Sequence, residues 1–344
     1  MQLTIKRKWG AFLDSKFSNT LIVGAGAMAI NHHLPRFIDV LGCKHIDILE
    51  TNPQRRAELI KRFDRDAKIE LIDQLPDPKD IYDLVLISTP PKFHVEYFEL
   101  LQANAGVFLI EKPMTMNADE ARIICQIASE KEKKVFVHLI RRTLKAYTLI
   151  KTLWELRLFG ELKSVRLFEG GVFDWNAVSM GSFSNELNGG GVLMDTGPHA
   201  IDLLFQVFEN IELVESRMDA LAPAIEANCV LKLSADKGVP VLLSLTRNRN
   251  FSNETVFDFE NAEVRAGVRN NNIKVNLKHD VSFIAVPTDI TSNQCVNFSS
   301  LIDDYYNKYL LSGINNDVAP EDSLKIAELI DAAYSNAELI REGF

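Results

Sequence analysis

The strongest constraint on the fold is an alternation of short apolar runs with helical stretches across residues 18–140. Strands that alternate with helices of about 10–15 residues are typical of βαβ units, in which the strands are parallel and the crossovers right-handed. A doubly wound parallel sheet is therefore expected here. Its predicted strands are residues 20–24, 45–50, 83–89, 106–113 and 135–140, and its predicted helices are 28–41, 53–65, 93–104 and 117–131.

The pattern changes after a predicted helix at residues 143–158. Runs such as ELKSVRLFEGG, VPVLLSLTRNR and TVFDFEN alternate apolar and polar residues with no helix between them, which predicts an open, mostly antiparallel sheet. Helices are expected at 300–311 and 320–342. The predicted organisation is an N-terminal extension (1–17), a dinucleotide-binding domain (18–140) and a substrate and oligomerisation domain (141–344), with helix 320–342 packing back on the first domain.

Composition limits the classes of function. A chain of 344 residues with 47% hydrophobic and 25% charged residues is expected to form two globular domains. A net charge of −9 without a basic block argues against nucleic acid as a partner, and no apolar run is long enough to span a membrane. Four scattered cysteines without CxxC spacing argue against a zinc site and disulfides, so we expect a cytoplasmic protein without a metal.

The sequence LIVGAGAMA (21–29) places G-x-G-x-x-A between the first strand and the first helix. The first glycine allows a tight turn, the second allows a pyrophosphate to approach the backbone, and the small third residue keeps the helix near the sheet. This context predicts a dinucleotide site. Its predicted contacts in this turn are Gly24, Ala25, Gly26, Ala27 and Met28.

Glu50 ends the second predicted strand, about 20 residues further on, where a carboxylate can accept hydrogen bonds from the ribose diol. It favours NAD over NADP because it would repel a 2′-phosphate, although NADP stays possible. The alternative is that Glu50 caps a helix or is solvated. Arg55 and Arg56 follow closely and are expected on the solvated face of the second helix.

Two further segments end strands at the same edge of the sheet, where ligands bind in doubly wound folds. Ser88, Thr89 and Pro90 are predicted to contact the cofactor. His94 is a cofactor contact or, as an alternative, a packing histidine. Glu111 and Lys112 are also predicted to contact the cofactor, and Pro113, which follows them, restrains the local backbone. The Lys112 ammonium is expected to stabilise the alkoxide that forms as hydride leaves.

The segment NGGGVLMDTGPHAID (188–202) joins a glycine triplet to two acids and a histidine. His199 is expected in the first turn of a helix, where the helix dipole favours the neutral imidazole that can accept a hydroxyl proton. Asp195 is expected to orient His199, with Asp202 as the alternative. The glycines are expected to bring the backbone close to the active-site cleft.

These motifs in this order resemble the glucose–fructose oxidoreductase, inositol dehydrogenase and rhizopine catabolism (Gfo/Idh/MocA) family. GAGAMA, STPPKFH, IEKP, GGGVLMDTGPHAIDLL and the closing EDSLKIAELIDAAYSNAE carry the resemblance from about residue 18 onward. It implies an NAD(P)-dependent dehydrogenase or reductase acting on a secondary alcohol or ketone of a sugar, cyclitol or nucleotide sugar. It also implies Lys112, Asp195 and His199 as catalytic residues, and a homodimer or homotetramer. A redox-assisted lyase or glycosidase with recycled NAD, and a non-catalytic dinucleotide sensor, are the alternatives.

The segment VFVHLIRRTLKAY (135–147) departs from the family pattern at Ile140 and Lys145. Arg142 remains a candidate substrate contact beside Lys112, Asp195 and His199. Trp175 is a candidate wall of a sugar site, as is Phe183, with core packing as the alternative for both. Arg247 and Arg249 could bind an anionic group, although a solvated strand end is the preferred interpretation.

Overall fold

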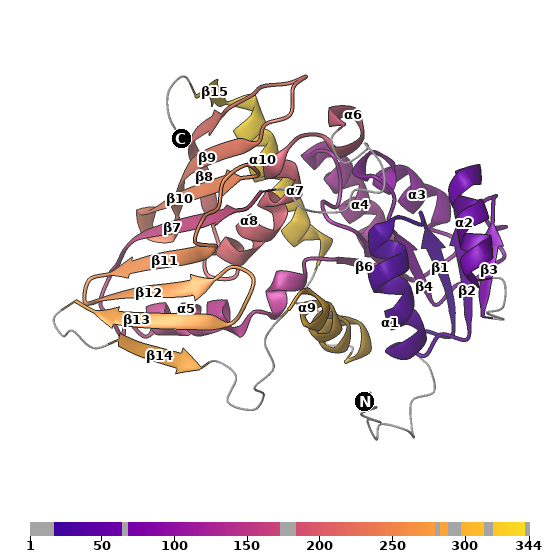
Figure 1. The fold of residues 1–344 in the computed structure, drawn as a ribbon, viewed down its shortest axis with the longest axis horizontal. Coiled ribbons are helices and arrows are strands. Elements are labelled where there is room, and N and C mark those ends of the chain that lie inside the picture. Colours follow the sequence, from indigo (N-terminus) through magenta and orange to yellow (C-terminus); the bar gives the residue numbers. More distant parts are fainter. Residues whose placement is uncertain are drawn as a thin grey trace.

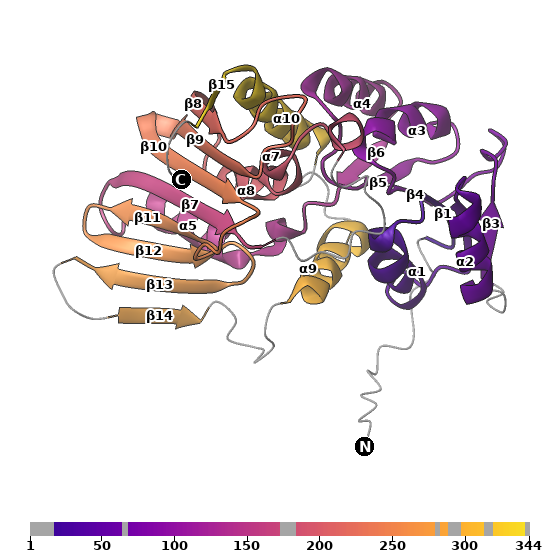
Figure 2. The same ribbon diagram turned by 45° about the horizontal axis from the view of Figure 1, so that its top comes forward.

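A computed structural model describes residues 17–63, 68–172, 184–278, 283–287, 297–312 and 319–340. These residues form two sheets that lie side by side, with helices around and between them (Figure 1). The N-terminal sheet, drawn in indigo and purple, stays separate from the C-terminal sheet when the molecule is turned (Figure 2). Loops from both halves therefore meet in the region between the two sheets.

The N-terminal sheet has six strands in the order β3-β2-β1-β4-β5-β6, and all of its pairs are parallel. Every residue of β4 is fully buried, as expected for a strand covered on both faces. The predicted doubly wound sheet is therefore confirmed. Its strands are β1 (Asn19–Val23), β2 (His45–Leu49), β3 (Ile69–Ile72), β4 (Leu84–Ile87), β5 (Val107–Ile110) and β6 (Lys134–Val137).

Strand β3 was not among the predicted strands. It has only four residues, lies at the edge of the sheet and includes the exposed Glu70, so its apolar run is too short to stand out. The helices between the strands lie close to their predicted positions. They are the continuous helix of η1 (Ala29–His33, π-helical) and α1 (Leu34–Asp39), then α2 (Pro53–Phe63), the 3-10 turn η2 (Pro91–Phe93), α3 (His94–Leu101) and α4 (Ala118–Glu130).

The C-terminal sheet has nine strands in the order β14-β13-β12-β11-β7-β10-β9-β8-β15. Its pairs are antiparallel except β7 with β10 and β8 with β15, which confirms the predicted, mostly antiparallel sheet. The strands are β7 (Leu162–Gly170), β8 (Ile211–Met218), β9 (Asn228–Ala235), β10 (Val239–Thr246), β11 (Glu254–Phe259), β12 (Ala262–Gly267), β13 (Asn272–Leu277), β14 (Phe283–Pro287) and β15 (Ala337–Leu339).

One face of this sheet packs against helices, and the other carries ion pairs. On the outer face Arg265 binds Glu254 at 2.7 Å and Glu263 at 2.8 Å, and Lys232 binds Glu215 at 2.6 Å. The expectation of a homo-oligomer was based partly on an exposed sheet face that needs cover. Partly exposed Phe168 and Leu242 lie on the same face, since they pair with Glu254 and Lys232, so the face mixes paired charges with apolar side chains and the oligomeric state stays a prediction.

Helix α10 (Pro320–Ser335) connects the two halves of the molecule. The backbone N–H of Ala118, at the start of α4, donates to Asp331 at 2.8 Å, and Arg122 binds Glu328 at 2.7 Å. The predicted helix 320–342 ends early, because the chain leaves the helix after Ser335 and pairs as β15 with the edge of β8. The other C-terminal helices are the 3-10 turn η3 (Ile140–Thr143), α5 (Lys145–Glu155), α6 (Asn185–Asn188), α7 (Val192–Asp195), α8 (Gly197–Phe205), the short turn η5 (Asp236–Gly238) and α9 (Phe298–Tyr305), which continues as η6 (Tyr306–Leu311).

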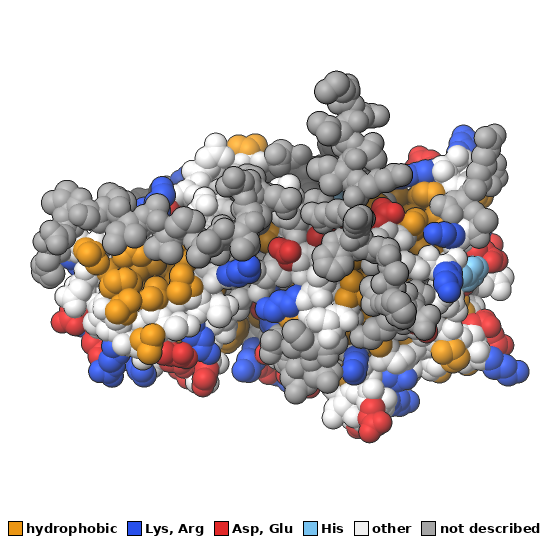
Figure 3. Space-filling model, turned by 90° about the horizontal axis from the view of Figure 1, so that it is seen from below, with side chains coloured by type: hydrophobic (Ala, Val, Ile, Leu, Met, Phe, Trp, Pro, Cys, Tyr) orange, Lys and Arg blue, Asp and Glu red, His pale blue; other side chains and the backbone are white. Residues whose placement is uncertain are grey.

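Among the described residues, no helix has both the length and the apolar character required to cross a bilayer. On the face of the molecule seen from below, hydrophobic side chains gather in one patch at the left, and acidic and basic side chains are mixed over the rest (Figure 3). On this face the negative net charge of the chain is therefore not gathered into one acidic surface.

Candidate active site

The glycine-rich turn after β1 lies against the loop that follows β4. Gly24 has a φ of +86°, and a Cβ there would lie 2.9 Å from the carbonyl oxygen of Ser88, so only glycine fits. Beside Gly26 there is open space, since the only atom near a Cβ would be that same oxygen at 3.9 Å. The helix begins at Ala27. An open cradle at a helix N-terminus fits the pyrophosphate of a dinucleotide.

Glu50 is fixed at the carboxyl end of β2, next to this turn. Its carboxylate accepts the backbone N–H of Ala25 at 3.2 Å and that of Asn52 at 2.8 Å, and Arg55 lies 3.9 Å away. This is the place where a ribose diol is expected. Arg56 was expected on a solvated face, but its guanidinium donates to the carbonyl oxygen of Ile72 at 2.6 Å and so covers the end of β3.

The loop after β4 follows the glycine turn closely, because the N–H of Ser88 bonds the carbonyl of Val23 at 2.8 Å. Ser88, Thr89 and Pro90 therefore begin at the predicted sheet edge. His94, however, is fully buried, and its nitrogens face the carbonyl oxygens of Thr89, at 2.8 Å, and of Pro113 and Met114, both at 3.1 Å. This corrects the predicted cofactor contact of His94: its ring joins two loops of the site instead.

Glu111 was also predicted to contact the cofactor, and here too the structure corrects the prediction. Its carboxylate faces inward and binds His33 at 2.6 Å and His138 at 2.9 Å, while accepting the N–H of Lys112 at 3.1 Å. Burial raises the pKa of Glu111, but the two histidines outweigh burial and hold the pKa well below its usual range. The ligand atoms of this triad lie within 4.8 Å of one another, and one oxygen of Glu111 bonds both rings, while Nε2 of His138 has no partner among the described residues. Glu111 therefore anchors the backbone of Lys112.

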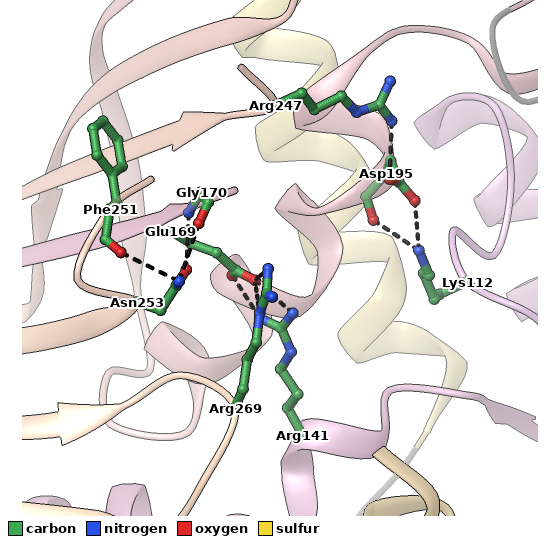
Figure 4. A network of polar contacts seen from close by, with 9 residues as sticks. All are labelled: Lys112, Arg141, Glu169, Gly170, Asp195, Arg247, Phe251, Asn253 and Arg269. Atoms are coloured by element: carbon green, nitrogen blue, oxygen red, sulfur yellow. Dashed lines mark hydrogen bonds and ion pairs between the residues drawn. The ribbon is translucent and has the colours of Figure 1, made fainter. Parts of the chain in front are cut away.

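Lys112 extends from the end of β5 toward the C-terminal half. Its Nζ donates to Oδ1 of Asp195 at 2.8 Å and to the carbonyl oxygen of Asp195 at 2.9 Å, while Arg247 donates to Oδ2 at 2.9 Å (Figure 4). Burial raises the pKa of Asp195, but the two cations outweigh burial and keep the pKa well below its usual range. Asp195 is therefore an anion that holds two cations in place.

His199 lies in the first turn of α8, as predicted, and is 8% exposed. Burial lowers its pKa well below 6.5, and the charges of Arg141 and Lys112 add to that effect, so its imidazole is neutral. Its Nδ1 is buried without a hydrogen-bond partner among the described residues. No hydrogen bond joins His199 to Asp195 among the described residues, since the oxygens of Asp195 accept from Lys112 and Arg247, so the orientation of His199 by Asp195 stays a prediction.

The alternative partner, Asp202, forms no hydrogen bond with His199 among the described residues either. One oxygen of Asp202 binds Arg142 at 2.7 Å, and Arg142 also binds Asp322 of α10 at 2.9 Å. All but about a tenth of Arg142 is buried. Arg142 is therefore a cross-link between η3, α8 and α10, which corrects its predicted contact with substrate.

The glycine triplet has a packing role that the sequence did not indicate. Gly189 has a φ of +79°, a Cβ on Gly190 would overlap the hydroxyl of Tyr334, and a Cβ on Gly191 would overlap the carbonyl oxygen of Glu226. The Glu226 carboxylate accepts the N–H of Gly191 at 2.9 Å, and that of Leu193 at 2.9 Å. The glycines thus let the loop lie directly on Glu226 and Tyr334, which fixes the turn that carries Asp195.

A second ionic cluster lies beside the first in the same view (Figure 4). Glu169, at the end of β7, is fully buried and accepts two hydrogen bonds from Arg141 at 2.6 and 2.7 Å and one from Arg269 at 3.0 Å. Because Arg141 also acts on the pKa of His199, this cluster borders the predicted catalytic residues. Trp175 and Phe183, the predicted aromatic wall, lie outside the described residues.

Comparison with known proteins adds the family context. Residues 18–139 match a model described as an oxidoreductase family with an NAD-binding Rossmann fold, and residues 149–265 match the GFO/IDH/MocA C-terminal domain. The chain is 30% identical over 202 residues to oxidoreductase P35 of Formosa agariphila, a match that covers 56% of this chain and 61% of that protein. It is 28% identical to the scyllo-inositol 2-dehydrogenase (NADP(+)) IolW of Bacillus subtilis, over 63% of this chain and 59% of the relative.

These matches span about three fifths of each of the two curated relatives. Among solved structures, the 3-ketoreductase KijD10 of Actinomadura kijaniata, in complex with NADP and TDP-benzene, has a TM-score of 0.74. The two chains are 17% identical, and the match covers 94% of this chain and 98% of KijD10. At that identity the likeness establishes the fold only.

Proposed function

The chain belongs to the Gfo/Idh/MocA oxidoreductase family, and from this premise we propose that it is an NAD(P)-dependent dehydrogenase or reductase. In this proposal it transfers hydride between nicotinamide and a secondary alcohol or ketone of a sugar, a cyclitol or a nucleotide sugar. The observation that carries the proposal is the contact of 2.8 Å between Lys112, at the end of a Rossmann strand, and Asp195, from the C-terminal half. It places a cation beside the edge where the cofactor cradle lies.

In the proposed mechanism, the bound nicotinamide supplies the acceptor or donor of hydride. Lys112 donates a hydrogen bond to the reacting oxygen of the substrate and stabilises the alkoxide. His199, kept neutral by its surroundings, takes the hydroxyl proton at Nε2 during oxidation and returns it during reduction. Asp195, which also accepts a hydrogen bond from Arg247, holds the Lys112 ammonium in place.

We also propose NAD as the preferred cofactor. The Glu50 carboxylate at the end of β2 is fixed by two backbone N–H groups, so it cannot easily turn away from a 2′-phosphate. Arg55, 3.9 Å from Glu50, is the cation that could offset this repulsion and admit NADP.

The test starts with fluorescence titrations of the purified protein with NAD⁺ and NADP⁺. A panel of inositols, free sugars and nucleotide sugars then follows, with NADH absorbance as the readout. We expect tighter binding of NAD⁺ and turnover of at least one member of the panel. The variant Glu50→Gln is expected to narrow the preference for NAD⁺, while Glu70→Gln, on the neighbouring edge strand, serves as the matched control.

The other outcomes are distinct. Dinucleotide that co-purifies and is recycled without net NADH would favour the redox-assisted lyase or glycosidase. Dinucleotide binding without any chemistry in either direction would favour a sensor. A protein that binds neither dinucleotide would contradict the proposal.

A further inference from the structure

Three strand ends bring two arginines and a glutamate to one edge of the C-terminal sheet, next to Asp195. Strands β12, β7 and β10 all run in the same direction, so Arg269, Glu169 and Arg247 all lie at or just beyond their carboxyl ends. The strand pairing shows that β12, β7 and β10 end at nearly the same height. Thr246 pairs with Gly170, and Glu254 pairs with both Phe168 and Gly267. Arg269 lies two residues beyond the last pair of β12 and donates to Glu169 at 3.0 Å.

The lateral spacing suits a small ligand. Strands β12 and β10 are three steps apart in the order β12-β11-β7-β10, and each step is about 4.8 Å, so their ends lie about 14 Å apart. Arginine side chains that extend from both ends can reach the two sides of one sugar-sized molecule. Glu169 ends the strand β7 between them.

The groups at this edge form one wall of the site, and its charge is not balanced. Asp195 is bound by Lys112 and Arg247, and Glu169 by Arg141 and Arg269, so four cations share two carboxylates (Figure 4). Glu111, buried behind Lys112, offsets one of the two excess positive charges.

In the second cluster the exposed side chain is that of a cation, Arg269, whereas Arg141 and Glu169 are buried. The side chain of Glu169 is fully buried, whereas that of Arg269 is 53% exposed. The lowered pKa of His199 also indicates a positive electrostatic potential at this wall. Burial lowers its pKa, and the positive charges of Arg141 and Lys112 outweigh the opposite influence of Glu111.

From this arrangement, and resting on the proposed function, we infer that the substrate is a polyhydroxylated molecule that carries an anionic group, a carboxylate or a phosphate. Arg269, the exposed arginine, binds that group, while Arg247 borders the opposite side of the ligand and Lys112 meets the reacting oxygen. The planar guanidinium forms paired hydrogen bonds with either anion, and a neutral sugar would leave the excess positive charge of the wall unmatched.

Isothermal titration of the dinucleotide-loaded enzyme tests this inference independently of turnover. The ligands are D-glucuronate as the carboxylate, D-glucose 6-phosphate as the phosphate and D-glucose as the neutral reference. We expect at least one charged ligand to bind more tightly than glucose by about 10-fold or more, the order expected for charge-assisted hydrogen bonds. The charged ligand that binds more tightly identifies the anion that the wall accepts.

Substitutions locate the effect. Arg269→Gln should weaken the charged ligands by about 10- to 100-fold, and Arg269→Lys should restore part of that loss. Arg265→Gln is the matched control, since Arg265 lies on the same strand but pairs with Glu254 and Glu263 on the outer face. It should leave all three affinities unchanged.

Equal binding of glucose and both charged ligands would overturn the inference, as would an equal effect of Arg269→Gln and Arg265→Gln. Turnover distinguishes this result from failure of the proposed function. If the enzyme oxidises neutral polyols but not their acidic counterparts, the proposed function holds and the inference of an anionic substrate fails. If the enzyme binds charged ligands preferentially but never produces NADH, the anion site holds and the proposed function fails.

Discussion

Asp195 and Asp202 lie seven residues apart, on either side of the start of α8, and their ion pairs differ in exposure to solvent. The Asp195 side chain is 44% exposed and joins Lys112 of the Rossmann half to Arg247 of the other half. The Asp202 side chain is 1% exposed and binds Arg142 within the fold. The first group can exchange partners with a ligand, while the second is sealed.

Their pKa values differ in the same sense. Burial raises the pKa of both acids, but at Asp195 the two cations outweigh burial and lower the pKa, whereas at Asp202 burial prevails and the pKa is raised. Proximity of an acid to an arginine is therefore a poor guide to chemistry. The exposure of the ion pair to solvent distinguishes a pair that can bind a ligand from one that only cross-links the fold.

Breaking the sealed pair should produce the largest change. Asp202→Ala removes one of the acids that bind the buried Arg142, and loss of one partner of a buried pair costs about 3–5 kcal/mol of unfolding free energy. Urea unfolding measures this loss. Asp195→Ala, the matched change at the exposed pair, should cost less than about 1 kcal/mol. Similar losses in the two variants would mean that the two pairs do not differ as described.

Removing the cation of the exposed pair should act on turnover instead. Lys112→Met removes the donor to the substrate alkoxide, and loss of one such donor lowers kcat by about 10²- to 10³-fold. Dinucleotide binding and urea unfolding should stay close to those of the unchanged protein. The control is Lys92→Met, because Lys92 pairs with Glu186 on the surface near α6. A Lys112→Met enzyme with normal kcat would remove Lys112 from the mechanism.

The sequence predicted the fold well because both sheets leave local signals. The runs of β4 and β5 are continuous and apolar, and the alternation of β10 and β11 has a period of two. The motif residues Lys112, Asp195 and His199 could also be selected in this way. Strand β3 and the early end of α10 depend on edge pairing, which local patterns do not encode.

Partners within the site could not be predicted, because they are set by contacts between distant segments. Arg247 was considered a solvated strand end, but the parallel register of β10 with β7 brings it to Asp195. Glu226 reaches the glycine triplet from 35 residues away, and His33 reaches Glu111 across 78 residues. An unusual run such as GGG signals a tight contact without naming its partner.

The glycine triplet offers a test of how rigidly Asp195 is held. Gly191→Ala would place a methyl group on the backbone carbonyl of Glu226, which cannot swing aside as a side chain would. Overpacking of this kind costs about 1–3 kcal/mol, and the displaced turn should also lower kcat by moving Asp195. Gly106→Ala is the matched control, since a Cβ there meets nothing within 4 Å. Equal stability of the two variants would contradict the packing role of the triplet.

The smallest expected effect concerns the acid limb of the pH profile. Burial and the charges of Arg141 and Lys112 put the pKa of His199 well below 6.5, so the base should remain neutral at pH 6. A histidine with an ordinary pKa of about 6.5 would be only about one quarter neutral there, and kcat/KM for oxidation would fall about fourfold. We therefore expect log kcat/KM to show no inflection from His199 between pH 8 and 6.

The pH dependence of the free energy of unfolding follows from the same lowered pKa and supplies a check on the pH profile. Because the folded protein binds a proton on His199 less readily than the unfolded chain does, the contribution of His199 to stability is present above pH 6.5 and is lost as the pH falls below that value. His199→Gln should remove this dependence along with most of the turnover. An acid limb centred near pH 6.5 in the unchanged enzyme would mean that His199 is open to solvent in the working complex. The site would then lack the sealed, positive surroundings that distinguish it from an ordinary surface histidine.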